Sequence, residues 1–380
     1  MDYFEESLAL HSKLKWKLDI KAKMPINGKN DLSLLYTPWV AAPCLAIKED
    51  KQKVYDYTFK WNTVAVVSDG SAVLWLWNIW AEAWLPVMEW KAVLFKEFAW
   101  INAVPLMLDT QDTEEIIKIV TALAPNFWWI NLEDISAPRC FEIESRLKNS
   151  LNIPVFHDDQ HWTAIVCVAW LINALKITWK NKDEIKVVIN GLWAAWTAIL
   201  KLVHAFWVGK IVVCDSKGVV SKYRDDLNDE KLAILDLVDS DTKEKTLSWA
   251  LKWADVFIWV SKGNILTSID VQNMNKDSII FAMANPIPEI MPDVAKSSWA
   301  MIVATWRSDF PNQLNNVLVF PWIFKWALSY RIPKITEEMK MNAAYALANY
   351  VDVPNPDKII PDPLDRKVAD VIAESLILSH

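Results

Sequence analysis

Tryptophan and glycine occur in inverted proportions in this chain of 380 residues, which contains 24 Trp and only 6 Gly. Glycine makes up roughly 7% of an average protein, so about 27 would be expected at this length. The two residue types together number 30, which is close to that expectation. Glycine alone takes left-handed backbone angles and close backbone approaches at little cost, whereas an indole clashes there. The tryptophan positions therefore constrain the possible folds more than any other feature.

The tryptophans crowd places where a tight turn would call for glycine. Two clusters, within SAVLWLWNIWAEAWLP and INGLWAAWTAIL, contain Trp75, Trp77, Trp80, Trp84, Trp193 and Trp196. We hypothesise that the gene uses UGA as a glycine codon that was read as tryptophan, so that the printed glycines come from GGN codons. The coding DNA tests this hypothesis, because UGG codons at most of the 24 positions would contradict it.

Composition and charge exclude several classes of protein. A hydrophobic content of 53% in 380 residues is enough for the cores of two domains. The net charge of −7 offers no basic face to a nucleic acid, and the apolar run over 164–175 is too short to span a bilayer. The chain starts with an acidic segment unlike a secretory signal, and its cysteines form no CxxC pair. We therefore expect a cytoplasmic protein that binds neither nucleic acid nor membrane.

The pattern of apolar residues changes near residue 160. Residues 1–160 read as short helices and strands with polar clusters, including a helix near 3–18 and a capping box formed by Asp112 and Glu115. Beyond this point, apolar β-branched runs alternate with helical stretches, which is typical of an α/β fold with a doubly wound parallel sheet over 161–380. The expected strands are 185–190, 210–215, 255–260 and 278–285, and the expected helices are 163–177, 194–206 and two in the last ~45 residues.

A turn after the first expected strand of this second domain comes close to a dinucleotide-binding fingerprint. The motif G-x-G-x-x-G would be complete if two of its tryptophans were glycine, over Gly191, Leu192, Trp193, Ala194, Ala195 and Trp196. Its glycines let the backbone approach the pyrophosphate at a helix N-terminus. Asp215 ends the next strand and is placed to accept from a ribose 2′-hydroxyl, which favours NAD. As printed, the Trp193 indole would take the place of the pyrophosphate.

Two short acidic segments of the first half suggest a site for a hard cation. NLEDI and FHDDQHWTA supply the carboxylates of Glu133, Asp134, Asp158 and Asp159. Such a density of carboxylate oxygens suits octahedral Mg²⁺ or Mn²⁺. His157 and His161 would suit zinc, but they lie near no cysteine, and histidines so placed are more often structural.

Four segments resemble the short bacterial malic enzymes, and the resemblance covers nearly the whole chain. They are YTPW (36–39), VAVVSDGSAVLWLWNIW (64–80), FHDDQHWTA (156–164) and ATWRSDFPNQLNNVLVFPWIFKWA (304–327). Tryptophan stands where these family motifs have glycine, which supports the codon hypothesis independently of composition. One departure is Ala72, because larger members of the family have an arginine near this position that holds a malate carboxylate.

The resemblance implies roles for particular residues. Tyr36 corresponds to the general acid, Lys91 to the general base, and Asp158 to the carboxylate that holds the lysine. Glu133, Asp134 and Asp159 correspond to the metal ligands. Asn285 and Asn316 correspond to amides near the nicotinamide and the substrate. Lys91 has to be neutral to take a hydroxyl proton; a nearby cation favours that form and Asp158 opposes it while orienting the amine.

The implied function is conversion of L-malate to pyruvate and CO₂ by a homodimer that requires NAD or NADP and a divalent metal. Two alternatives stay open at this stage. A malolactic enzyme would retain its cofactor and release lactate, and a non-catalytic relative would be favoured if the 24 indoles were genuine. The choice between NAD and NADP also stays open, because residues beyond Asp215 can change it.

Overall fold

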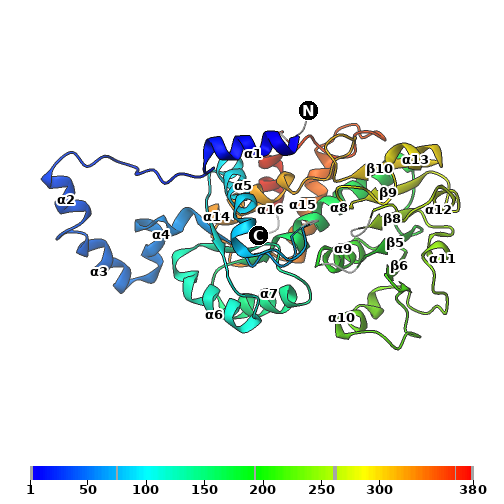
Figure 1. Ribbon diagram of the computed structural model, residues 1–380, viewed down its shortest axis with the longest axis horizontal. Helices are drawn as coiled ribbons and strands as arrows, with labels where there is room; N and C mark the ends of the chain where they lie inside the picture. Colours follow the sequence, from blue (N-terminus) through cyan, green and yellow to red (C-terminus); the bar gives the residue numbers. More distant parts are fainter. Residues whose placement is uncertain (1–2, 74–75, 192–193, 260–262, 364, 378–380) are drawn as a thin grey trace.

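The computed structural model describes residues 3–73, 76–191, 194–259, 263–363 and 365–377, and two parallel sheets form its framework (Figure 1). The first half of the chain builds a four-stranded sheet in the order β2-β1-β3-β4, with every pairing parallel. Its strands are β1 (Thr63–Ser68), β2 (Asn102–Met107), β3 (Trp129–Leu132) and β4 (Val155–His157). Strands β1, β3 and β4 are buried at every residue, as expected when helices cover both faces.

The second half builds a six-stranded sheet in the order β10-β9-β8-β5-β6-β7. This arrangement confirms the predicted doubly wound α/β fold, and its one departure is the antiparallel edge strand β7. The order reverses between β5 and β8, and a ligand crevice lies at such a switch point, at the carboxyl ends of the strands. The strands are β5 (Lys186–Asn190), β6 (Lys210–Asp215), β7 (Gly218–Val219), β8 (Val256–Trp259), β9 (Ser278–Ala282) and β10 (Ala300–Thr305).

Sixteen helices are found in the described part of the chain. Those before the second sheet are α1 (Tyr3–Leu14), α2 (Lys29–Leu35), α3 (Ala41–Glu49), α4 (Val54–Tyr57), α5 (Ala81–Ala99), α6 (Thr113–Leu123), α7 (Arg139–Ser150) and α8 (Asp158–Thr178). The rest are α9 (Ala194–Ala205), α10 (Asp229–Leu232), α11 (Leu247–Leu251), α12 (Ser268–Gln272), α13 (Pro292–Ser297), α14 (Phe320–Ser329), α15 (Glu337–Asn349) and α16 (Val368–Ile377). Helix α1 is shorter than predicted, because Lys15 takes a left-handed φ of 65°.

The predicted cap of α6 is present. The Asp112 carboxylate accepts from the Glu115 backbone N–H at 2.9 Å, which satisfies one of the donors that a helix leaves open at its start. The Glu115 carboxylate accepts instead from the Thr110 hydroxyl.

The predicted long buried helix is α8, which crosses the interior from the end of β4. It contains a stretch, Gln160–Thr178, that is long and apolar enough to span a membrane by length and composition alone, and 89% of the tested window is buried inside the protein. The core helix of a soluble protein passes the same test. Asn173, five residues before its end, donates from Nδ2 to the carbonyls of Ala348 at 2.8 Å and Ile359 at 2.9 Å.

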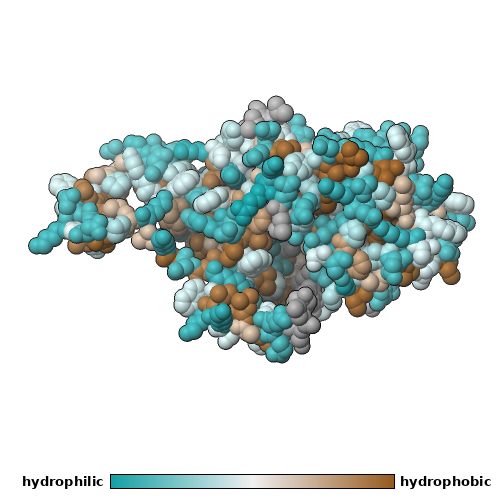
Figure 2. Space-filling model, turned by 90° about the horizontal axis from the view of Figure 1, so that it is seen from above, coloured by the Kyte–Doolittle hydropathy of each residue, from teal (hydrophilic) through white to brown (hydrophobic). Residues whose placement is uncertain are grey.

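Helices α2, α3 and α4 form an arm that projects from the rest of the molecule (Figure 1). None of the residues in these three helices is buried. Figure 2 shows apolar side chains among the polar ones on the surface of this arm. The large apolar residues exposed on it include Leu32, Leu34, Leu35, Tyr36, Trp39 and Leu45.

Several tryptophans occupy backbone conformations that favour glycine. Among the described residues, six have a left-handed φ between 55° and 82°: Trp77, Trp100, Trp179, Trp207, Trp253 and Trp299. A second set has a buried indole N–H that makes no hydrogen bond: Trp129, Trp162, Trp170, Trp196, Trp306 and Trp326. Left-handed angles and orphaned buried donors are both costly for tryptophan and cost glycine little or nothing. The two sets support the hypothesis that these positions are glycine in the natural protein.

Candidate active site

Lys91 lies between two carboxylates in the interior. Its side chain comes from the third turn of α5, and Nζ is 2.8 Å from Asp158 Oδ1 and 3.2 Å from Glu133 Oε1. Glu133 follows β3, and Asp158 begins α8 directly after β4, so the parallel pairing of β3 with β4 brings their ends together. All three residues are buried, which makes the ion pairs stronger than surface pairs. The structure thus assembles three of the predicted site residues.

The buried carboxylates around Lys91 exceed the positive charge that the lysine supplies. Asp134 is also buried and follows Glu133 with a left-handed φ of 51°. Asn131 donates from Nδ2 to Glu133 Oε2 at 2.8 Å and holds that carboxylate on the inner side of the sheet. Two carboxylates contact the one ammonium, and the third lies next to Glu133 in the chain. Their oxygen atoms are of the kind that hard divalent cations such as Mg²⁺ prefer.

Two observations bear on the predicted cation ligands. The Asp159 side chain lies outside the described part of the structure, and within that part no cluster of three potential ligands has metal-binding geometry. The Trp84 indole N–H donates to Asp134 Oδ2 at 2.8 Å. An indole at position 84 therefore occupies an oxygen that a cation would use, and a glycine there would leave this oxygen open.

A buried polar network supports the start of α8 from the side opposite Lys91. Glu144 on α7 accepts from the His157 backbone N–H at 2.8 Å, from Lys148 at 2.8 Å and from His161 Nε2 at 2.9 Å. Lys340 on α15 contacts His161 Nδ1 at 2.9 Å. An ammonium only donates, so Nδ1 must accept, and the proton that faces Glu144 must lie on Nε2. The network thereby fixes the histidine tautomer.

The same network shifts the pKa values of its members. Burial, with a smaller contribution from Lys340, outweighs the opposing effect of Glu144 and lowers the pKa of His161 to about 4. Burial alone would raise the pKa of Glu144, but its hydrogen bonds and charges with His161 and Lys148 outweigh burial and hold it well below the usual range. His161 is therefore neutral at physiological pH and serves as a structural residue, in line with the sequence interpretation that preferred this role over zinc binding.

Residues from the C-terminal half close the site from the other side. The Phe320 ring of α14 lies 4.1 Å from Lys91 Nζ, so the ammonium also contacts an aromatic face. Asn316 begins a short 3₁₀ helix (Asn316–Leu318), and its Oδ1 accepts from the Thr163 hydroxyl of α8 at 3.4 Å. Asn285 follows β9 and is half-buried. The structure thus ties Asn316 to α8, the helix that carries Asp158.

The described contacts do not place Tyr36, the predicted general acid, near Lys91. It lies at the C-terminal end of α2 on the projecting arm and is 71% exposed. Figure 1 shows α2 directed away from the region where α5, α14 and α8 meet.

The turn after β5 has the setting that a dinucleotide fingerprint requires. Gly191 has a φ of 131°, and α9 begins at Ala194. Leu192 and Trp193 lie outside the described residues, as do the side chains of Ala194 and Ala195. Trp196 is 3% exposed with an unpaired indole N–H. The strand, turn and helix fit the cofactor, whereas the indole fills the space that the third glycine of the motif would leave.

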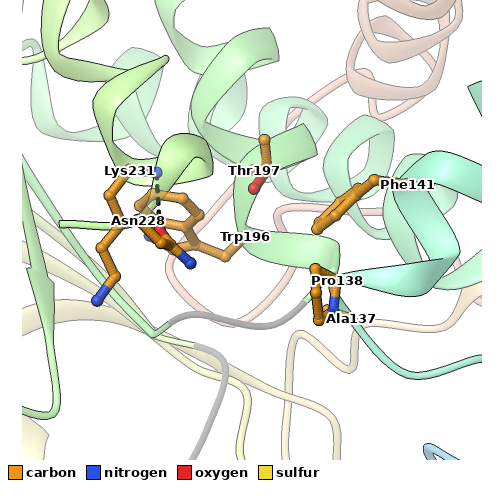
Figure 3. A pocket seen from close by; sticks show the side chains of 7 residues that line it. All are labelled: Ala137, Pro138, Phe141, Trp196, Thr197, Asn228 and Lys231. Carbon is orange, nitrogen blue, oxygen red and sulfur yellow. Dashed lines mark hydrogen bonds between the residues drawn. The ribbon is translucent and has the colours of Figure 1, made fainter.

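A cavity of about 220 Å³ adjoins this turn and is drawn in Figure 3. Trp196 stands between Asn228 and Lys231 on one side and a group from the first domain on the other (Figure 3). The cavity is lined by Ala137, Pro138, Phe141, Trp196, Thr197, Asn228 and Lys231.

Asp215 ends β6 as predicted, but cations surround it. Arg224 Nη1 lies 2.9 Å from its Oδ1 and Lys231 Nζ lies 2.8 Å from its Oδ2. The Lys217 backbone N–H also donates to Oδ1 at 2.8 Å. Although burial raises the pKa of Asp215, these hydrogen bonds outweigh burial and lower it overall.

Comparison with known protein families accounts for both halves of the chain. Residues 15–148 match the malic enzyme N-terminal domain, and residues 161–376 match the malic enzyme NAD-binding domain. The chain belongs to the malic enzyme family. This membership and the parallel sheets confirm the predicted family and fold.

Relatives within the malic enzyme family are similar over nearly the whole of this chain. A bifunctional malic/malolactic enzyme of Bacillus subtilis is 52% identical over 99% of this chain and 92% of its own length. An NAD-dependent malic enzyme of Geobacillus stearothermophilus is 51% identical over 95% of this chain and 76% of its own length. The crystal structure of an NAD-dependent malic enzyme from Thermotoga maritima superposes with a TM-score of 0.94, at 47% identity, over 97% of this chain and 98% of that one.

Three residues that contact the candidate active site of this malic enzyme were not predicted from the sequence. They are Asn131, Glu144 and Phe320, which contact Glu133, the start of α8 and Lys91 respectively. Asn131 could have been noticed, because it is a polar residue in an otherwise apolar strand. Glu144 and Phe320 carried no such signal, since they reach the site only through tertiary packing.

Proposed function

We propose that the chain oxidises L-malate at C2 and decarboxylates it to pyruvate and CO₂, with NAD or NADP as the hydride acceptor. The observation that carries this proposal is the buried Lys91, held 2.8 Å from Asp158 at the edge of the carboxylate cluster. A buried lysine oriented by a carboxylate suits proton abstraction from a hydroxyl group. Membership of the malic enzyme family gives this chemistry its substrate.

Lys91 is proposed as the general base and Asp158 as the residue that positions it. The contact with Asp158 and the Phe320 ring restrict the ammonium to one location, so a neutral amine there would face a bound hydroxyl with little rearrangement. Glu133 also contacts Lys91, at 3.2 Å. Engagement of Glu133 by a cation would remove one of the two carboxylates that favour the charged form of the lysine.

The proposed cation ligands are Glu133, Asp134 and Asp159, with Mg²⁺ or Mn²⁺ as the metal. A divalent cation bound there would polarise the 2-keto oxygen and stabilise the enolate that remains when CO₂ leaves. The buried carboxylates around Lys91 support this assignment. Asn131 holds one Glu133 oxygen and leaves the other directed toward the lysine, so the carboxylate is oriented in advance.

Tyr36 is proposed as the acid that protonates the enol, and we infer that it reaches the site of a second copy of the chain. The arm that carries it exposes Leu35 at 49%, Trp39 at 61% and Leu45 at 57%. Soluble monomers rarely leave such a contiguous apolar surface open to water, so this surface suits burial in a homodimer.

Mixing two inactive variants tests this arrangement. In a Tyr36→Phe plus Lys91→Met mixture, half of the dimers combine both chains, and each of these has one intact site if tyrosine and lysine come from different copies. We expect recovery of about a quarter of the wild-type activity. Each variant alone serves as the control, and no recovery in a mixture shown to exchange subunits would place both residues in one chain.

Product analysis tests the reaction itself. We expect malate and Mn²⁺ to yield pyruvate with one NADH or NADPH per turnover, followed at 340 nm. Lactate formed without net cofactor reduction would identify a malolactic enzyme instead, an alternative favoured by the name of the bifunctional Bacillus subtilis relative. Absence of both products in folded protein would support a non-catalytic relative.

We propose a cytoplasmic location, because the cysteines form no CxxC pair and three of the four are buried thiols.

A further inference from the structure

We propose that the adenosine end of the dinucleotide site selects NADP, with Lys231 as the main residue that binds its 2′-phosphate and Arg224 as its support. This inference rests on the proposed function, because it assumes that a dinucleotide binds at the turn after β5. It reverses the sequence-based expectation that Asp215 favours NAD.

In the arrangement observed, Asp215 cannot accept a hydrogen bond from a ribose hydroxyl. Its side chain has no exposed surface, and both of its oxygens already accept hydrogen bonds. Selection of NAD at this position requires a carboxylate oxygen that is free to accept from the 2′-hydroxyl. The carboxylate therefore acts within the protein, as an anchor for the cations around it.

Cations outnumber carboxylates in the cluster around Asp215. Lys217, Arg224 and Lys231 supply three positive charges, against two negative charges from Asp215 and Asp226. The two cations that pair with Asp215 offset the repulsion that a strand-end carboxylate would exert on a phosphate. A phosphate can also share the donors, because its oxygens accept several hydrogen bonds at once.

Lys231 is better placed than Arg224 to contact the phosphate directly. Arg224 uses Nε and Nη2 on Asp226, at 2.7 and 2.8 Å, and Nη1 on Asp215. Within the described part of the structure, the Lys231 ammonium makes one hydrogen bond, to Asp215, and an ammonium has three donors. Lys231 also lines the cavity beside α9, whereas Arg224 does not.

The cavity supplies the space for the adenosine end. Asn228 and Lys231 line one side of it, and Thr197 of the first turn of α9 lines another part (Figure 3). The Trp196 side chain takes up part of this space, and a glycine at that position would enlarge the cavity. The cluster therefore lies where a ribose bound beside the helix N-terminus would carry its 2′ substituent.

Calorimetric binding of 2′,5′-ADP and 5′-AMP tests the proposal without relying on catalysis. We would use the full chain carrying Trp193→Gly and Trp196→Gly, in which the fingerprint is complete. We expect 2′,5′-ADP to bind roughly tenfold more tightly than 5′-AMP, because a charge-assisted hydrogen bond to phosphate is worth about one order of magnitude in affinity. Lys231→Gln should remove this preference while changing 5′-AMP binding less than twofold, and Lys231→Arg should retain it.

Lys222→Gln is the matched control, because it removes the same charge from the segment that precedes α10. Lys222 pairs with Asp241 at 3.0 Å, outside the cluster around Asp215. Equal affinity for the two nucleotides in the parent chain, or equal losses in the Lys231→Gln and Lys222→Gln variants, would overturn the selection of NADP and leave the dinucleotide site intact. Failure of both nucleotides to bind would overturn the dinucleotide site itself, and this inference with it.

Discussion

Helix α5 has a tryptophan at each end, and the two indoles allow the cost of a left-handed tryptophan to be measured. Trp80 precedes the helix with φ of −68°, and Trp100 follows it with φ of 63°. The Trp100 N–H donates to the Lys96 carbonyl, which is the hydrogen bond of an αL cap, and the Ile101 N–H donates to Phe95. This is the position at which helices most often have glycine.

The matched exposure of the two indoles isolates the backbone contribution. Trp80 is 73% exposed and Trp100 is 70% exposed, so replacement by glycine removes nearly equal packing at the two sites. Both replacements also raise the backbone entropy of the unfolded chain by the same amount. The remaining difference is the left-handed conformation, which costs a residue with a Cβ roughly 1–2 kcal/mol. We therefore expect the Trp100→Gly variant to be more stable than the Trp80→Gly variant by about 1–2 kcal/mol.

Urea unfolding followed by circular dichroism measures this difference, provided that the two variants have equal m-values. Both variants are made in the same parent chain, so that the other tryptophans contribute equally. A difference below about 0.5 kcal/mol, within which surface substitutions normally fall, would refute the argument that tryptophan is strained at left-handed positions. The codon hypothesis would then lose its structural support.

Further predictions concern the site and its supporting network. Lys91→Met should lower kcat by roughly 10²–10⁴-fold with little change in the KM for malate, and pre-steady-state kinetics would show whether chemistry has become limiting. Trp84→Gly should lower the Mn²⁺ concentration for half-maximal activity, because it frees an Asp134 oxygen; an unchanged concentration would argue against Asp134 as a ligand. His161, with its pKa lowered to about 4, stays neutral in the folded protein while the unfolded chain binds a proton below about pH 6.5. The free energy of unfolding should therefore fall by up to about 3 kcal/mol between pH 6.5 and 4, and His161→Gln should flatten this dependence in urea titrations at several pH values.

Four of the six strands of the second sheet could be predicted, because their signal is local. Strand β6 was expected at 210–215 and spans Lys210–Asp215, since an unbroken β-branched run bounded by polar residues has few other conformations. Strand β10 was not predicted, although AMIVAT is equally apolar. The edge strand β7 has only two residues, too few for any periodicity.

In the site, too, residues within recognisable motifs could be predicted, whereas contacts that depend on tertiary packing could not. The pairing of Lys91 with Asp158 was implied by the family resemblance, and in the structure the two side chains lie 2.8 Å apart. Asp215 was placed correctly at the end of β6, but its function was inferred from one residue type at one position. Arg224 and Lys231, which change that inference, lie 9 and 16 residues further along the chain. Sequence spacing through an irregular loop does not show which side chains fold back on a strand end.

Helix α8 links Asp158 to the C-terminal segment, and its sequence determines where this link could bend. It is continuous for 21 residues, about 30 Å, from the acidic start that holds Asp158 to its end beside the second sheet. Asn173, five residues before its end, fixes it to the C-terminal segment through two buried hydrogen bonds. Trp162 and Trp170 lie between Asp158 and this attachment, and glycine at these two positions would make that part of the helix easier to bend. A displacement of the C-terminal segment would therefore carry the last turns of α8 with it, whereas Asp158 could stay in contact with Lys91.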